Sequence, residues 1–405
     1  MADTYNASPR KHHNLLERHP RRQRWGAVYL CACIAALFWS PAFANNDINP
    51  LGLDSIAPSP TTQFALASSL EQERHPIRDK YMFRFEFDND ILSGQDDGFT
   101  GGLSLQLHSP FYDSWEDLFP GWIGHLPTFG DDGIGGRAVR WSLGLSQIMI
   151  TPRKLTIAEP QPNDLPWVGI LGVHGALSSY DNYRLSAIQL YLGCMGPCSQ
   201  AENVQRFLHE DLGLGDPPAG WSNQLDTEIL GNLNLAWRHK LWVPPDSAYT
   251  AGGWTSDFAI GGQLGIGNLA TFAQAHIEGR FGRGLPTGFT HIPDLPGMSI
   301  TLDPIYIPQD ELPEDFPKWH GYASVVLRAT YFERLAPSEG GSTENGGFHP
   351  GMDPNYGHPD LLIGLHMVRA PLSLHLTYCL DVYGPSKKTY ENHAQWANFS
   401  LEYRF

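Results

Sequence analysis

Apolar and polar residues alternate strictly over the last thirteen residues of the chain, 393–405. A strand points successive side chains to opposite faces, so this segment has one apolar face and one polar face. The apolar face carries Ala397, Phe399, Leu401, Tyr403 and Phe405. In a soluble sheet such a face packs on a core, whereas in a membrane barrel it faces lipid and the polar face lines the lumen. The alternation alone fits both kinds of protein.

Alternating segments of this kind recur from residue 80 to the carboxyl end. They lie near 80–88, 100–108, 138–150, 166–178, 182–193, 226–240, 254–267, 269–281, 319–333, 360–369, 371–383 and 393–405. This even number of about twelve predicts an all-β fold, a transmembrane antiparallel β-barrel with both chain ends on the periplasmic side. Loop length then suggests which side each connection occupies. The short turns at 268–269 and 370–371 are expected to be periplasmic, and the long loops at 109–137, 282–318 and 334–359 to face outward.

The stretch 199–212 departs from this period. Its apolar residues recur at helical spacing, with Val204, Phe207, Leu208 and Leu212 on one face. We therefore predict a short helix in an outer loop, packed on or over the barrel mouth. Gln205 and His209 are four residues apart, so a helix places them one above the other on one side.

The amino terminus has the pattern of an export signal. Six basic residues precede residue 25, an apolar run covers 25–39, and Ala42-Phe43-Ala44 is a small-residue cleavage site. The run is shorter than the ~20 residues that a membrane-spanning helix needs. We predict a signal peptide over 1–44, a polar segment over 45–79 and a barrel over 80–405, located in the bacterial outer membrane.

The charge of the chain limits its partners. Lys and Arg number 27 and Asp and Glu number 43; without the export segment these become 21 and 41. Such a surface repels nucleic acid, so no nucleic-acid partner is expected. Cys194 and Cys198 stand four residues apart, which in an exported protein favours a local disulfide over metal ligation. Cys379 is expected to be a thiol inside the barrel.

Several short motifs occur in a fixed order along the first half of the chain. They are Phe87-Asp88-Asn89-Asp90, Asp97-Gly98-Phe99-Thr100-Gly101-Gly102, the stretch 147–154, Gly196-Pro197, Val204-Gln205 with His209, and Gly220-Trp221 with Gln224. Together they resemble the outer-membrane lipid A 3′-O-deacylase family, twelve-stranded barrels that remove acyl chains from lipopolysaccharide. The chain departs from the family where Phe99 and Met149 replace tyrosine, and the spacing from His209 to Trp221 is one residue longer.

The resemblance implies a calcium-dependent ester hydrolase that acts on lipid A in the outer leaflet. His209 would activate the attacking water, because an imidazole can accept a proton near neutral pH. Gln205 would hold the imidazole or a water molecule. Lys154 would stabilise the oxyanion or contact a lipid A phosphate. Lipopolysaccharide and membrane lipid are the expected partners, and the protein is expected to be a monomer.

The resemblance also implies a Ca²⁺ ion, which prefers carboxylate and carbonyl oxygens. Asn89 and Asp90 would hold it and take part in catalysis, and the Thr100 hydroxyl would orient the metal site. A further acidic ligand is ambiguous: counting back from Trp221 gives Asp216, whereas counting forward from His209 gives Gly215.

Each of these residues also has an ordinary structural use. Asn89 and Asp90 are typical of strand ends and turns, and a histidine on a helix is usually a surface or packing residue. A serine hydrolase is disfavoured because the chain lacks a G-x-S-x-G elbow. A porin, a transporter or a structural barrel without catalytic activity is the alternative function.

Overall fold

The computed structural model describes most of the predicted barrel. The described residues are 80–89, 99–112, 114–119, 121, 138–180, 183–213, 215–245, 253–294, 314, 316–335, 340–350, 355–381 and 395–405. The predicted signal peptide, the polar segment to residue 79 and Asp90 lie outside them. Within these ranges no helix has the length and apolar character needed to cross a bilayer.

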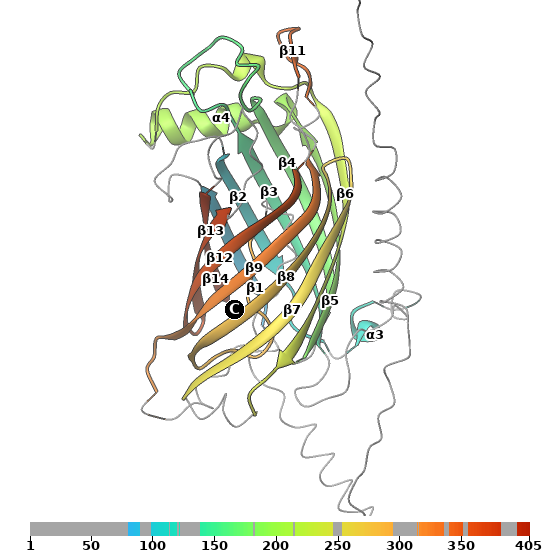
Figure 1. The fold of residues 1–405 in the computed structure, drawn as a ribbon, viewed down its shortest axis with the longest axis vertical. Coiled ribbons are helices and arrows are strands. Elements are labelled where there is room, and N and C mark those ends of the chain that lie inside the picture. The colour runs from blue at the N-terminus through green and yellow to red at the C-terminus, as the bar shows by residue number, and fades with distance from the viewer. Residues whose placement is uncertain are drawn as a thin grey trace, which may run out of the picture. The chain divides into compact units, whose positions relative to one another are not determined.

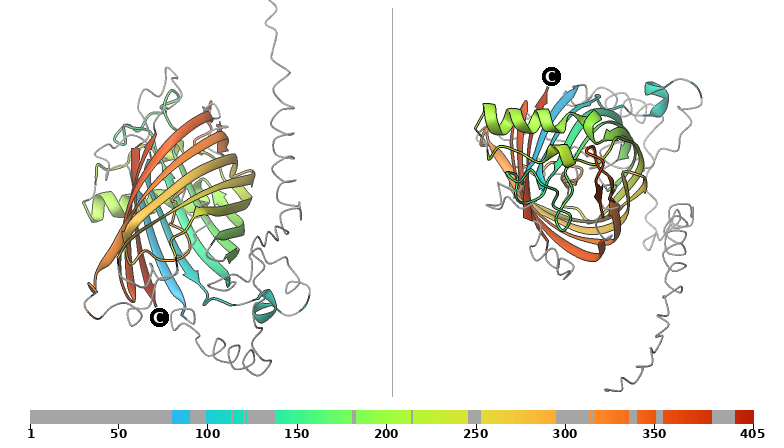
Figure 2. Two further views of the ribbon diagram at one scale, coloured as in Figure 1. Left: turned by 60° about the horizontal axis from the view of Figure 1, so that its bottom comes forward. Right: turned by 90° about the horizontal axis from the view of Figure 1, so that it is seen from above.

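The main chain forms a closed antiparallel barrel of twelve strands, as the alternation predicted (Figure 1). The strands are β1 (Met82–Asn89), β2 (Phe99–His108), β3 (Ala138–Ile150), β4 (Val168–Tyr180), β5 (Arg184–Met195), β6 (Glu228–Trp242), β7 (Trp254–Gly267), β8 (Ala270–Arg283), β9 (His320–Leu335), β12 (Asn355–Arg369), β13 (Leu372–Asp381) and β14 (Gln395–Arg404). Each lies within a few residues of its predicted range. Seen from above, the strands form a ring (Figure 2).

The barrel closes where β1 pairs with β14. Met82 lies opposite Arg404 and Asn89 lies opposite Ala397. Closure matters because a strand edge in hydrocarbon would leave backbone donors and acceptors without partners. Short additional elements lie outside the ring: α3 (Trp115–Leu118) and the hairpin of β10 (Gly341–Ser342) and β11 (Phe348–His349).

The two faces of the carboxyl-terminal strand are those predicted from its alternation. Tyr403 and Phe405 are about half exposed, whereas Ser400 and Glu402 are fully buried in the barrel interior. The same alternation holds on β13, where Leu376 is exposed and its neighbours in sequence are buried. The apolar side chains therefore face outward and the polar ones line the lumen, as in an outer-membrane barrel.

Buried charges in the lumen are paired. The carboxylate of Asp257 on β7 accepts from Arg280 Nε at 2.8 Å and lies 2.9 Å from the Lys240 ammonium. On the next two strands of the ring, Arg328 Nε on β9 donates to Asp360 on β12 at 2.9 Å. Charges taken out of water are tolerated only when they are compensated in this way.

A segment of the chain, 284–294, also lies inside the lumen. Thr290 N donates to Glu278 Oε1 on β8 at 2.8 Å, and His291 Nε2 lies 2.6 Å from Glu86 Oε1 on β1. These strands are five apart in the ring of twelve, so the segment crosses the interior. Residues 288–293 are buried. We refer to residues 284–294 as the lumen segment; it occupies part of the described interior.

Three of the predicted loop positions were wrong. Successive strands run in opposite directions, so the connections after β2 and after β8 fall at the end of the barrel where β1 begins and β14 ends. The connections 109–137 and 282–318 therefore join strand ends on the periplasmic side, and the short turn at 268–269 is on the outer side. Loop length gave the wrong side for these connections, because the direction of the strands that a loop joins decides on which side of the membrane it lies. The assignments of 334–359 and 370–371 agree with the strand order.

A charge on the outward face should destabilise the barrel. Leu327 lies near the middle of β9 and is 48% exposed. We expect Leu327→Arg to cost about 2–4 kcal/mol, because the guanidinium would face hydrocarbon near the bilayer midplane. Urea unfolding in lipid vesicles measures this cost, and Leu327→Met provides the control. Equal stability of the arginine and methionine variants would show that this face does not contact lipid.

Candidate functional site

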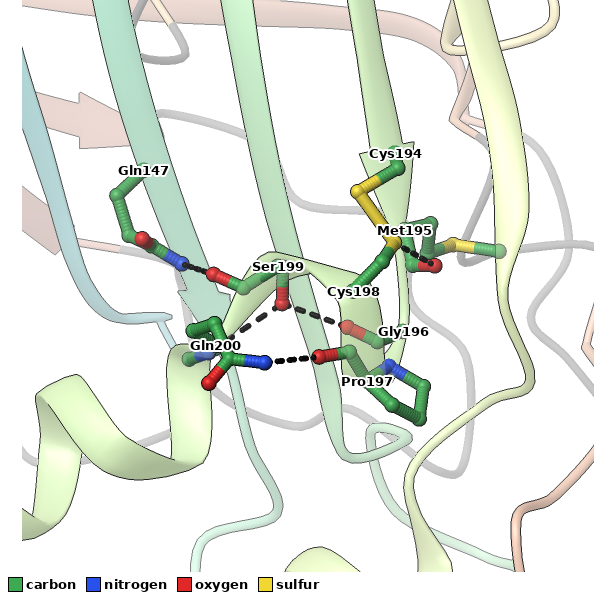
Figure 3. Close-up of a disulfide and its surroundings, with 9 residues drawn as sticks. Gln147, Cys194, Met195, Gly196, Pro197, Cys198, Ser199 and Gln200 are labelled. Atoms are coloured by element: carbon green, nitrogen blue, oxygen red, sulfur yellow. Dashed lines mark hydrogen bonds between the residues drawn. A yellow bond between two sulfur atoms is a disulfide. The ribbon is translucent and has the colours of Figure 1, made fainter.

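The predicted helix follows β5 directly. It consists of a 3₁₀ turn, η3 (Pro197–Ser199), the helix α4 (Ala201–Arg206) and a π-helical turn, η4 (Phe207–Asp211). The Cys194–Cys198 disulfide, predicted from the spacing, joins the end of β5 to η3 (Figure 3). Gly196 has φ of 90°, and a side chain there would lie 2.6 Å from two carbonyl oxygens. This tight connection fixes where the helix begins.

The beginning of the helical segment packs on the outer surface of the barrel wall. Odd-numbered residues of β3 and β4 point outward, as the exposure of Leu143 and Val173 shows. Gln147, on this outward face, donates from Nε2 to Ser199 O at 3.1 Å (Figure 3). A side chain at Gly169 would overlap Ala201 and Ser199. The expected position on or over the mouth is thus refined: the segment rests against the outside of the wall.

An apolar cluster holds the helical segment in place. It consists of Met149, Leu155, Trp167, Ala201 and Trp221, with Val204 and Leu208 packed against it. The two tryptophan rings meet edge to face with centroids 5.2 Å apart. Because the cluster joins β3, the loop after it, the helical segment and the 3₁₀ turn η5 (Trp221–Asn223), it makes one rigid platform from four parts of the chain.

His209 is buried in η4 and has a defined proton position. Its Nδ1 lies 2.6 Å from the main-chain oxygen of Asp216. A carbonyl oxygen can only accept, so Nδ1 carries the hydrogen and Nε2 of the neutral ring is left as a proton acceptor. Gly215 packs against the imidazole ring of His209, and a side chain there would lie 2.7 Å from His209 Cε1 and Nδ1. The two residues left ambiguous by counting thus both contact His209, Gly215 by packing and Asp216 through its backbone.

Gln205 lies one helical turn before His209 and is fully buried. Its Oε1 accepts a hydrogen bond of 2.6 Å from Trp221 Nε1. This contact orients the amide, and its Nε2 has no hydrogen-bond partner among the described residues. A buried donor without a partner is costly, so it is a site where a bound water or substrate oxygen would be stabilised.

Asn89 reaches the same side of the wall from β1. Its Nδ2 lies 3.5 Å from the position that a side chain at Gly101 would occupy, and Met149 Cε lies 3.7 Å from that position. Gly101 pairs with Met149, and Met149 pairs with Gly169. We call this outward row of Asn89, Gly101, Met149 and Gly169 the site row. It connects Asn89 to the platform that carries the helix.

The other predicted site residues are less closely defined. Lys154 is exposed in the loop after β3, and its main-chain oxygen accepts from Gln161 Nε2 at 3.1 Å. Thr100 lies in β2 at a break in the pairing between Phe99 and Gly101, and its side chain is outside the described part. The Asp216 carboxylate is exposed. Asp90 lies outside the described residues, so its role stays a prediction.

A second outer connection secures this platform. In the β10–β11 hairpin, Glu344 accepts from Gln224 Nε2 at 2.9 Å, and Asn345 donates to Asn223. His349 Nε2 donates to the Asp164 carbonyl at 3.0 Å. Partial burial lowers the pKa of His349, although this hydrogen bond acts in the opposite direction. These contacts were not predicted, since they join residues more than a hundred positions apart.

Sequence comparison finds one family for this chain. A family model described as outer membrane protein LpxR matches residues 30–405. A comparison with curated proteins finds no match. The family match covers almost the whole chain, including all twelve strands.

One solved structure supports the same fold. LpxR from Salmonella typhimurium is similar with a TM-score of 0.57 and 14% identity, covering 80% of this chain and all of the other. The beta domain of the Bordetella autotransporter BrkA, at 10% identity and a TM-score of 0.36, covers 80% of this chain and 97% of its own. Only the first likeness is strong enough to support the fold. The order of motifs, the twelve-stranded outer-membrane barrel and the match over residues 30–405 agree: the chain belongs to the LpxR family, the lipid A 3′-O-deacylases of the outer membrane.

Proposed function

We propose that this protein is an ester hydrolase that removes an acyl chain from lipid A of lipopolysaccharide in the outer leaflet. The observation that carries the proposal is the buried His209, whose Nδ1 hydrogen is held by the Asp216 carbonyl while Nε2 is left to accept a proton. This imidazole belongs to a helical segment that packs on the outside of the barrel wall, where outer-leaflet lipid can approach laterally.

The residues support a simple hydrolysis. Water attacks the ester carbonyl carbon while His209 Nε2 takes one of its protons. The tetrahedral intermediate then collapses, the bond to the alkoxide oxygen breaks, and His209 returns the proton to that oxygen. The Asp216 carbonyl steadies the imidazolium through Nδ1, as an acceptor does in other histidine-based hydrolases. The Gln205 amide donates to the water or to the oxyanion.

The proposed calcium site fits the chemistry of its donors. Asn89 offers an amide oxygen and Asp90 a carboxylate, the hard oxygen ligands that Ca²⁺ takes, and the exposed Asp216 carboxylate could add a third. No cluster of three or more histidine, cysteine or acidic residues forms a metal site among the described residues, so the proposal depends on Asp90. When bound, the ion would polarise the ester carbonyl. Lys154 would supply a further positive charge toward an oxyanion or a phosphate.

A pore function receives no support from the interior. The lumen segment crosses the barrel, and the charged side chains around it are paired with one another or with its backbone. The monomeric state expected from the sequence stays a prediction.

The proposal is tested with purified protein and purified lipopolysaccharide. We expect mass spectrometry to detect lipid A that has lost one acyl chain, together with the free fatty acid. A chelator should abolish the release and added Ca²⁺ should restore it, because the ligand set is suited to a hard cation. Release that persists in chelator would remove calcium from the mechanism but leave the hydrolase. Intact lipid A in the presence of calcium would refute the hydrolase.

A further inference from the structure

A shallow groove of about 640 Å³ lies on the outward face of strands β1–β5, on the same side of the wall as the site row. Its lining is mainly apolar and includes Gly144 and Gly175. We propose that this groove holds an acyl chain of the lipid substrate and selects that chain by its length. The inference rests on the proposed function, because it concerns the lipid whose ester the site would cleave.

The strand register places the groove close to the site row, on its periplasmic side along the same strands. Moving along the strands away from the site row, the next outward row is Leu103, Gln147 and Leu171. The row after that is Leu105, Leu145, Val173 and Leu192, and the following row is Phe83, Leu107, Leu143, Gly175 and Leu190. The last two rows line the groove. They are called the upper and lower groove rows below.

Gly175 creates the gap in the lower groove row. Its paired neighbours Leu143 and Leu190 are 58% and 53% exposed and project outward on either side of it. A side chain at Gly175 would begin 3.3 Å from Leu143 Cδ2, inside the groove. The upper row has no such gap, since Val173 occupies the equivalent position. The groove is therefore deepest in the lower row.

The distances suit a chain that descends from the site. A strand rises roughly 3.4 Å per residue, so the upper and lower groove rows lie about 14 Å and 20 Å along the strands from the site row. With a strand tilt of about 45°, these become depths of about 10 Å and 14 Å. One leaflet of a bilayer is about 15 Å thick in its hydrocarbon part. A long acyl chain attached near His209 would thus reach the Gly175 gap, whereas a short chain would end above it.

Shape rather than hydrophobicity must account for selection. Surrounding lipid tails are as apolar as leucine, so a chain gains nothing from the groove by leaving water. It gains close contacts with the leucine side chains on both sides, provided that the gap at Gly175 stays open. Only the row of Leu103, Gln147 and Leu171 separates the groove from the site row, so a chain lying in the groove keeps its ester near the site row. This proximity identifies the occupant as a chain of the substrate rather than any neighbouring lipid.

Filling the gap provides the test. Gly175→Leu places a side chain in the groove, and Gly279→Leu on β8 is the matched control. Gly279 also faces outward between exposed residues, and a side chain there would meet nothing within 4 Å. Both variants should fold and show unchanged heat modifiability. Their kcat/KM values are measured on two lipopolysaccharide preparations, one with long and one with short acyl chains at the cleaved position.

We expect Gly175→Leu to lower kcat/KM about ten-fold on the long-chain preparation, the lower range for rejecting a misfitting apolar group in a pocket, and to leave the short-chain value unchanged. Gly279→Leu should match the wild type on both. No change on the long chain, or an equal loss on both chains, would overturn the proposal.

A second measurement separates this inference from the function itself. Native mass spectrometry records the lipopolysaccharide retained by each protein without requiring turnover. Wild-type protein and Gly279→Leu should retain more long-chain lipopolysaccharide than Gly175→Leu. If the wild type releases no fatty acid, the proposed function fails, and equal retention by all three proteins would then overturn the groove as well.

Discussion

Replacing His209 by alanine should reduce acyl-chain release by about 10²–10⁴-fold, the usual contribution of a general base. The imidazole is the one proton acceptor that the platform buries with its tautomer set, through the contact of Nδ1 with the Asp216 carbonyl. Alanine removes that acceptor without touching the barrel wall. Added calcium should not restore the rate, since the missing function is proton transfer and not carbonyl polarisation.

The matched control for this variant is Glu210→Ala. Glu210 is the next residue of η4 and is exposed, so its removal should leave the rate unchanged. Release is followed by mass spectrometry of lipid A, and heat modifiability shows that each barrel is intact. A folded His209→Ala protein that cleaves lipid A at the wild-type rate would exclude histidine catalysis at this position.

The largest effect on stability is expected from Asp257→Asn. This substitution keeps the size of the side chain but removes the charge that Arg280 and Lys240 share, and all three side chains are buried. Within the described structure, no other carboxylate lies within salt-bridge distance of the Lys240 ammonium. Arg280 would keep only the more distant Glu278 carboxylate at 3.8 Å, and Lys240 would lose its carboxylate partner, so the substitution should cost about 3–5 kcal/mol.

Urea unfolding in lipid vesicles measures that cost. The double variant Asp257→Asn with Lys240→Met removes one of the uncompensated charges and should recover part of the loss. Asp257→Asn with wild-type stability would mean that water reaches this part of the lumen and solvates the cations. Activity of the folded fraction should be unchanged, because these residues lie inside the barrel and the site lies outside it.

The strands could be predicted from the sequence because the membrane imposes a strict rule on them. Every strand of the wall separates lipid from lumen, so its residues must alternate, and segments such as 372–381 show this over their whole length. The helix was also predictable, since Val204 and Leu208 recur at helical spacing and pack as that spacing requires. Strand alternation and helical spacing both relate residues that are close along the chain, so both can be recognised in the sequence.

Contacts between distant segments could not be predicted in this way. Nothing in the composition of residues 284–294 indicates that they enter the lumen, where their partners come from strands far away in sequence. The side of the wall on which the helix begins depends on Gly169, whose missing side chain makes room for Ala201. That relation is visible only once β4 and the helix are placed together.

The candidate site was predicted in part. The motifs identified His209 and Gln205, and the structure brings them to one turn of a buried face. The motifs could not show which residue orients His209, because Asp216 contacts it through a main-chain oxygen. Every residue type has such an oxygen, so the sequence does not indicate this contact. Trp221, which fixes the Gln205 amide, was present in a motif, but its partner was not apparent.

The lumen segment has a consequence for the cell that carries this protein. The outer membrane excludes toxic solutes only as long as its proteins do not add open passages. In this barrel the described part of the interior is crossed by the chain itself and holds paired charges, which leaves less room for solutes than an empty lumen would. Each copy in the membrane would thus weaken the barrier less than a barrel of the same size with an open lumen.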